Sequence, residues 1–380
     1  MTETSLRRDL PPFRADHVGS LLRPPALLDA RARFAAGELD ADALREIEDR
    51  SIAEVVGLQR DAGLQTATDG ELRRTSWHMD FIYQLEGVES TDEKLQVHFR
   101  NEQGDLDFEA AALRVTDRVS LGEPIFAAAF SFLAETVRQV APGLSPKLTI
   151  PSPSMVHYRG GRAAIDESVY PDLGAFWTDL SAAYAEQLRQ MADLGCTYLQ
   201  LDDTSLAYLN DPKQRELVAQ QGSDAEHQHE QYIRTINAAI ADRPPGLRVT
   251  THMCRGNYRS SWAAEGGYDF VAEALFSELA VDGFFLEYDD ERSGGFEPLR
   301  FVPEGKQVVL GLVTTKSGKL EDKDTLKRRI DEASKYVPLD QLCLSPQCGF
   351  SSTVEGNTLT LDEELAKLRL VVEVAHEVWG

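Results

Sequence analysis

Four side chains with metal-binding chemistry stand at the ends of apolar runs in the second half of the chain. His252 and Cys254 belong to RVTTHMC, and alternate residues of a strand point to the same face. Glu287 follows GFFL, and Cys348 follows LCLSPQ. An imidazole, two thiolates and a carboxylate suit tetrahedral zinc, and a metal would also explain a carboxylate at an apolar strand end. We therefore expect His252, Cys254, Glu287 and Cys348 to bind one Zn²⁺.

A cysteine or histidine at a strand has a simpler explanation when it is taken alone. A cysteine within a strand is usually a small buried hydrophobic residue, and we interpret Cys196 and Cys343 in this way. An isolated His-x-Cys pair is likewise a weak signal. The zinc hypothesis therefore depends on a fold that brings three distant strand ends together.

Such a fold is indicated by β-rich apolar runs that alternate with amphipathic helical stretches. This pattern is typical of an α/β protein, and eight runs predict a parallel sheet closed into a (β/α)₈ TIM barrel with its active site at the C-terminal strand ends. A doubly wound open sheet is the alternative, but no G-x-G-x-x-G follows the first run. The predicted strands cover residues 13–20, 66–72, 147–154, 198–203, 248–254, 283–289, 307–315 and 342–349. Helical periodicity covers 176–195, 322–337 and 359–379.

One stretch, residues 85–120, interrupts this alternation. It is polar, and LQVHFRNEQGDLDF within it predicts a β-hairpin around a glycine turn. We interpret the stretch as an insertion after the second strand of a single domain that spans residues 1–380.

The composition narrows the class of protein. The chain has 380 residues, of which 42% are hydrophobic and 27% charged, as in ordinary globular proteins. Its net charge of −24 disfavours nucleic acids and anionic membranes as partners. The sequence has neither a signal-type apolar region nor a run long enough to span a bilayer, so we expect a cytoplasmic location. The four cysteines do not predict a disulfide framework.

The remaining strand ends carry groups that could contact a substrate. His17 and Ser20 lie towards the end of the first run, Glu71 towards that of the second and Asp202 towards that of the fourth. Acidic groups gathered at one mouth commonly hold an amine or a second metal. The alternative is that they cap the next helix, which we expect for Asp203 and Thr204. Aromatic residues that could stack on a flat ring, or simply pack, are Trp77, Tyr158 and Phe350.

The motifs HVGSLLRP, DGE, LQLDD, THMC, FLEYDD and SPQCGF resemble, in this order, the catalytic barrel of cobalamin-independent methionine synthase. The resemblance extends over essentially the whole chain. It is stronger to the short, single-barrel bacterial members of the family than to its long members. It implies zinc at the four residues proposed above. It also implies that Ser20 contacts the homocysteine carboxylate, and that Glu71 and Asp202 contact its ammonium group.

The resemblance further implies the reaction. A methyl group would pass from N5-methyltetrahydrofolate, with or without a polyglutamate tail, to the zinc-bound thiolate of homocysteine, which gives methionine. A free thiol has a pKa of about 8.5, and coordination to zinc makes the thiolate the dominant form at neutral pH.

Two departures from the long enzymes of this family leave the methyl donor open. Those enzymes carry a second barrel that helps to bind the folate. They also carry, after the seventh strand, a histidine thought to protonate the departing folate nitrogen, whereas this loop reads GLVTTKSGKLED. Lys316 lies there, but a solvated lysine with a pKa of about 10.4 suits that task poorly. A methylated corrinoid presented by a partner protein is the alternative donor.

Two other functions compete with this hypothesis. One is alkyl transfer to another thiol, as in the epoxide-opening coenzyme M transferases, although Glu71 and Asp202 would repel a sulfonate. The other is a zinc-stabilised barrel that binds a ligand without catalysis. A structural zinc would, however, have four protein ligands at a site remote from the pocket. The sequence leaves homo-oligomer formation open.

Overall fold

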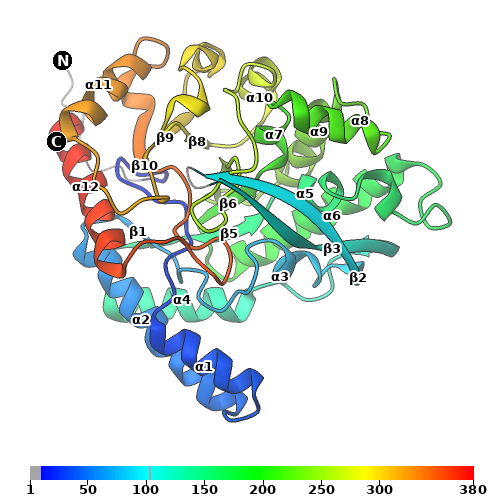
Figure 1. The fold of residues 1–380 in the computed structure, drawn as a ribbon, viewed down its shortest axis with the longest axis horizontal. Coiled ribbons are helices and arrows are strands. Elements are labelled where there is room, and N and C mark those ends of the chain that lie inside the picture. The colour runs from blue at the N-terminus through cyan, green and yellow to red at the C-terminus, as the bar shows by residue number, and fades with distance from the viewer. Residues whose placement is uncertain (1–9, 102–103) are drawn as a thin grey trace.

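The computed structural model describes residues 10–101 and 104–380, and its centre is a six-stranded parallel sheet (Figure 1). The strands lie in the order β10-β9-β8-β7-β6-β5. Every strand residue except the half-buried Arg248 is buried, which is why the runs read as almost continuously apolar. The predicted α/β class and parallel sheet are therefore confirmed. The strands are β5 (Leu148–Pro151), β6 (Tyr198–Asp203), β7 (Arg248–Met253), β8 (Gly283–Glu287), β9 (Gln307–Val313) and β10 (Leu342–Pro346).

The first two predicted strands are much shorter than the sequence suggested. Within 66–72 only β1 (Thr66–Ala67) forms, and it pairs in parallel with β4 (Ser145–Pro146). The run at 13–20 makes one parallel bridge, between Ala15 and Leu344 of β10.

Glycine conformations explain why these two segments end early. Gly19 and Gly70 have φ angles of +149° and +66°, which extended strands do not adopt. The segments are instead joined by single contacts: the Leu21 N–H donates to the Gly70 carbonyl at 3.0 Å, and the Thr68 hydroxyl donates to the Gly19 carbonyl at 2.6 Å. They therefore lie side by side without a regular ladder.

Helices surround the strands (Figure 1). The predicted helical stretches correspond to α6, α11 and α12, and the last begins with a capping box between Thr360 and Glu363. Among the described residues, no helix is long and apolar enough to cross a membrane. The helices are α1 (Pro25–Ala35), α2 (Ala41–Asp61), α3 (Met79–Ile82), α4 (Ala127–Val140), α5 (Ser154–Tyr158), α6 (Leu173–Asp193), α7 (Ser205–Tyr208), α8 (Pro212–Gln220), α9 (Gln228–Ile240), α10 (Ala272–Glu278), α11 (Lys323–Ala333) and α12 (Leu361–Trp379).

A long antiparallel hairpin of β2 (Glu86–Asn101) and β3 (Gly104–Ser120) occupies the stretch that interrupts the alternation. Residues 102 and 103, in its predicted turn, lie outside the described part. The hairpin passes in front of the sheet in Figure 1. Near its tip, the Arg100 N–H donates to the Trp262 carbonyl at 2.7 Å, and the Trp262 N–H donates to the Arg100 carbonyl at 2.8 Å. The hairpin is thereby attached to the loop that follows β7.

Candidate metal centre and substrate cavity

Three of the four predicted metal ligands meet at the C-terminal ends of β7 and β10. His252 is the penultimate residue of β7, Cys254 follows that strand directly, and Cys348 lies two residues after β10. Their candidate ligand atoms all lie within 4.8 Å of one another, and the two sulfur atoms are 3.2 Å apart. All three side chains are buried. This arrangement allows them to share one metal ion.

The chemistry of these donors fits zinc. Neither ring nitrogen of His252 makes a hydrogen bond of normal geometry with a described residue, although buried polar groups are normally satisfied. The ring lies close enough to the Cys348 sulfur to interact with it. The contact between the thiols lowers the pKa of Cys348 and raises that of Cys254, because one sulfur donates the proton that the other accepts. One imidazole and two thiols are ligands that tetrahedral zinc prefers.

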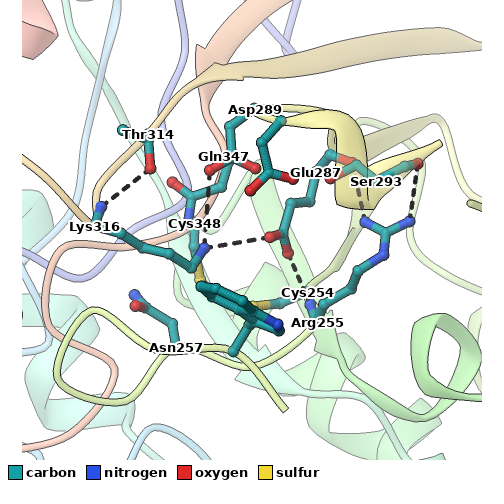
Figure 2. A network of polar contacts seen from close by, with 12 residues as sticks. Cys254, Arg255, Asn257, Glu287, Asp289, Ser293, Thr314, Lys316, Gln347 and Cys348 are labelled. Atoms are coloured by element: carbon teal, nitrogen blue, oxygen red, sulfur yellow. Dashed lines mark hydrogen bonds and ion pairs between the residues drawn. The ribbon is translucent and has the colours of Figure 1, made fainter. Parts of the chain in front are cut away.

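Glu287 lies near this group but is held by other partners. Its carboxylate accepts hydrogen bonds from the Arg255 N–H at 2.8 Å and the Lys316 ammonium at 3.2 Å (Figure 2). The Arg292 guanidinium donates a third at 3.1 Å. Burial favours the neutral carboxylic acid, but Lys316 and Arg292 outweigh it and lower the pKa of Glu287 to about 2. The carboxylate is thus ionised and paired with cations. Its role as a fourth metal ligand stays a prediction.

The expectation of a solvated Lys316 is wrong. The side chain is 9% exposed, and its ammonium lies 3.2 Å from Glu287 and 3.9 Å from Asp289 (Figure 2). Burial favours the neutral amine, but these two carboxylates outweigh it and raise the pKa of Lys316. Lys316 is therefore a fixed cation beside a predicted metal ligand, which makes it a still weaker proton donor.

A cavity that is open to solvent, with about 720 Å³ of space free of protein atoms, lies against the three candidate metal ligands. It is lined by His252, Cys254 and Cys348 together with four predicted substrate-binding residues, Ser20, Glu71, Trp77 and Asp202. His17 and Tyr158 are not among its lining residues. His17 is buried, and its carbonyl accepts a hydrogen bond from Lys147 at 2.6 Å, while Tyr158 lines an adjoining cavity.

Two buried carboxylates face this cavity. Asp202 stands near the end of β6, where Gln200 donates to it at 2.6 Å, and burial raises its pKa to about 7. Glu71 accepts a hydrogen bond from the Thr149 hydroxyl at 2.6 Å, and burial raises its pKa as well. Glu71 also has a φ of +58°, a conformation that is uncommon for non-glycine residues and is enriched at functional sites. Both groups would be stabilised by a cation in the cavity.

Ser20 is placed by a close approach of two loops. Its hydroxyl accepts a hydrogen bond from the Ser351 N–H at 3.3 Å. A Cβ atom at Gly349 would lie 1.9 Å from that hydroxyl, so only glycine fits beside Cys348. This contact fixes Ser20 next to Cys348, one of the candidate metal ligands.

The capping expectation for the loop after β6 is half correct. Asp203 accepts hydrogen bonds from the Leu206 N–H at 2.9 Å and the Ser205 hydroxyl at 2.8 Å, as a cap of α7 does. Thr204 occupies the N-cap position without a side-chain capping bond, because its hydroxyl contacts the sulfur of Met155 at 3.5 Å instead.

Aromatic residues of the hairpin complete the cavity wall, and the sequence reasoning missed them. Phe99 of β2 and Phe108 of β3 line the cavity with Tyr258, whose ring centroid lies 5.4 and 4.5 Å from theirs. The available signal was two phenylalanines on a polar hairpin that has little core of its own. With Trp77, they give the cavity a largely flat, apolar side.

Comparisons with known proteins identify the family of this chain. Residues 132–377 match the family described as the catalytic domain of cobalamin-independent synthase. The uncharacterized protein YxjG of Bacillus subtilis is 48% identical over 379 residues, which cover 99% of this chain and 97% of that protein. A Listeria monocytogenes structure, assigned as a vitamin-B12-independent methionine synthase, has a TM-score of 0.78 and 40% identity and covers 98% of this chain and 100% of that one.

A more distant relative is much longer. The 5-methyltetrahydropteroyltriglutamate–homocysteine methyltransferase of Herpetosiphon aurantiacus is 24% identical over 373 residues, which cover 97% of this chain and 43% of that protein. The family match and the two closer relatives extend over most or all of the chain. The chain therefore belongs to the cobalamin-independent methionine synthase family and is a methyltransferase.

Proposed function

We propose that this protein transfers a methyl group from N5-methyltetrahydrofolate to the thiol of homocysteine and so forms methionine. The observation that carries the proposal is one cavity whose wall contains both the three converging metal donors and two buried carboxylates. An amino thiol carries both groups that these two parts of the cavity would bind. Its thiol would lie at the metal donors, and its ammonium group at the carboxylates.

Zinc is the metal that these donors fit. We propose that His252, Cys254 and Cys348 hold it, and that Glu287 completes the set by exchanging its contact with Lys316 for one with the metal. When bound, zinc lowers the pKa of a coordinated thiol, so that a nucleophilic thiolate is present at neutral pH.

The carboxylates select the acceptor. Asp202 and Glu71 are desolvated, so an approaching ammonium group restores the stability of their charged forms. Ser20 can donate its hydroxyl proton to the carboxylate of the same substrate. A sulfonate thiol such as coenzyme M would be repelled by the two acids. The proposal therefore favours homocysteine.

The aromatic wall supports a folate as donor. Trp77, Phe99 and Phe108 offer flat surfaces on which a pterin ring can stack. The family description, cobalamin-independent, favours a folate over a methylated corrinoid. A ligand-binding role without catalysis is disfavoured because the metal donors line the cavity itself.

We also propose that the whole chain is one (β/α)₈ barrel in which residues 85–120 are an insertion. The segment at 13–20 supports closure, because it contacts β10 at Ala15 and the second segment at Gly19, whose carbonyl accepts a hydrogen bond from Thr68. β4 pairs with β1 and is separated from β5 by a single residue. The series of neighbouring strands therefore continues from β1 through β4 to β5.

A methionine-formation assay tests the function. The protein is incubated with homocysteine and either methyltetrahydrofolate or methylcobalamin, before and after chelation and zinc readdition. We expect methionine from the folate only, with loss on chelation and recovery with zinc. Cys348→Ser should lose this activity. Cys343→Ala, at a core cysteine outside the cavity, is the control and should keep it. Methionine from methylcobalamin alone would overturn the donor, and unchanged activity after complete zinc removal would overturn the metal.

A further inference from the structure

The segment that leads to Ser20 is held in place by side chains of its neighbours. Its parallel bridge to β10 lies at Ala15. Beyond this bridge, three consecutive backbone carbonyls, those of residues 17–19, each accept a hydrogen bond from a different side chain. The donors come from the residue between β4 and β5, from β6, and from the residue after β1. Lys147 donates to His17 at 2.6 Å, Gln200 to Val18 at 2.7 Å and Thr68 to Gly19 at 2.6 Å.

Gln200 also bonds to a residue of the proposed acceptor site. Its Nε2 atom donates both to the Val18 carbonyl at 2.7 Å and to the Asp202 carboxylate at 2.6 Å. An amide nitrogen carries two protons, so one is available for each bond. Gln200 and Asp202 lie two positions apart on β6 and therefore point to the same face of the strand. A single side chain thus joins Asp202 to the segment that leads to Ser20.

Gln200 can act on the site only through these two neighbours. Its side chain is fully buried, and it is not among the described residues that line the cavity. The other polar atom of its amide, Oε1, has no hydrogen-bond partner in the described part of the chain. A buried acceptor without a partner costs stability. The stability of the fold alone therefore does not explain a glutamine at this position.

We propose that Gln200 is a positioning residue that fixes the spacing between the two ends of the homocysteine site. This inference rests on the proposed function, in which Ser20 contacts the carboxylate of the substrate and Asp202 its ammonium group. In an α-amino acid both groups are bonded to the same carbon, so the residues that bind them must keep a defined separation. One amide bonded to both sides holds that separation before the substrate arrives, which lowers the cost of ordering the site on binding.

A comparison of three thiols tests this role. Calorimetry of the full-length, zinc-loaded protein measures the affinity for homocysteine, for 3-mercaptopropylamine, which lacks the carboxylate, and for 4-mercaptobutanoate, which lacks the ammonium group. The wild type should prefer homocysteine. Gln200→Met, which replaces the amide with an apolar group of similar size, should bind homocysteine about 10-fold more weakly, as for the loss of one hydrogen bond to a charged group. The two truncated thiols should lose less affinity, because each needs only one end of the site. Zinc affinity should not change.

Gln187→Met is the matched control. Gln187 of α6 is also fully buried, and its amide also makes two hydrogen bonds, with the Ile125 N–H at 2.9 Å and the Ile125 carbonyl at 2.8 Å. This variant should keep the preference for homocysteine. Gln200→Asn, whose amide is one methylene shorter and cannot reach both acceptors, should lose part of the preference, and it carries the test should Gln200→Met not fold.

The outcomes separate this role from the proposed function. If the wild type prefers homocysteine and a folded Gln200 variant keeps the full preference, the function stands and the positioning role is overturned. Equal losses for all three thiols would overturn it as well, because they would indicate general damage to the cavity. A wild type that binds the three thiols equally would overturn the homocysteine site itself and, with it, the role of Gln200.

Discussion

The sulfur atoms of Cys254 and Cys348 lie 3.2 Å apart, although the two residues are 94 positions apart in the chain. Two buried thiols in contact are held by the fold, so a metal would find its donors already assembled. We predict that Cys348→Ser weakens zinc binding by more than about 100-fold, since a direct ligand matters at least as much as the outer partners that orient it. Competition with a chelator measures the affinity. Cys343→Ala should bind zinc normally, and normal affinity in Cys348→Ser would remove this cysteine from the site.

The carboxylates Asp202 and Glu71 should control the affinity for homocysteine. Asp202→Asn and Glu71→Gln each remove a charged partner of the ammonium group, and the KM for homocysteine should rise about 10- to 100-fold in each. Zinc content should not change. Asp193→Asn, an exposed member of an ion pair with Arg189, is the control. A double variant with the wild-type KM would exclude the amino-thiol assignment.

Lys316 should oppose metal binding through Glu287. Its ammonium lies 3.2 Å from the carboxylate and competes with a metal for the same oxygen. Lys316→Met should therefore raise the zinc affinity by about 10-fold, as expected from the loss of one nearby charge contact. A chelator titration measures the change, with the exposed Lys319→Met as control. A large loss of kcat at constant zinc affinity would instead indicate that Lys316 takes part in proton transfer.

The hairpin should affect the methyl donor and not the metal. The Arg100 N–H bonds to Trp262, and Arg100→Pro removes that donor, whereas Arg100→Ala keeps it. We expect Arg100→Pro to raise the KM for methyltetrahydrofolate about 5- to 10-fold, in line with the loss of one backbone hydrogen bond of about 1 kcal/mol. Steady-state kinetics at saturating homocysteine provide the test. Equal donor KM values in the two variants would show that this contact does not shape the site.

Glu364 should make stability depend on pH. It is buried in α12, accepts a hydrogen bond from the Leu22 N–H at 3.1 Å, and burial raises its pKa from 4.5 to about 8. Between these values the folded chain keeps a proton that the unfolded chain has released, so the free energy of unfolding falls as pH rises. Glu364→Gln keeps the acceptor oxygen and cannot ionise.

The stability of Glu364→Gln relative to the wild type should therefore increase from pH 5 to pH 8, by about 2 to 4 kcal/mol. Chemical denaturation at the two pH values measures it. Glu373→Gln, at an exposed position of the same helix, should show no such trend. A difference between Glu364→Gln and the wild type that is the same at both pH values would contradict the expected titration.

The sequence predicted those features that depend on strand position. β6 to β10 are buried on both faces, so their sequences are nearly continuous apolar runs that predict strands. His252, Cys254 and Cys348 could therefore be placed at strand ends. Features set by tertiary contacts were not predictable. The pairing of Lys316 with Glu287 depends on the course of a loop, and the place of Phe99 depends on where a long hairpin attaches. The first two predicted strands are too long because Gly19 and Gly70 turn the backbone out of the extended conformation, which an apolar run does not reveal.

Zinc X-ray absorption spectroscopy of the purified protein tests the central claim most directly. With His252, Cys254 and Cys348 around one ion, the spectrum should show about one zinc per chain with two sulfur neighbours and lighter nitrogen or oxygen neighbours. Addition of homocysteine should introduce a third sulfur. Protein from zinc-supplied cells that contains no zinc, or zinc without any sulfur neighbour, would contradict the account.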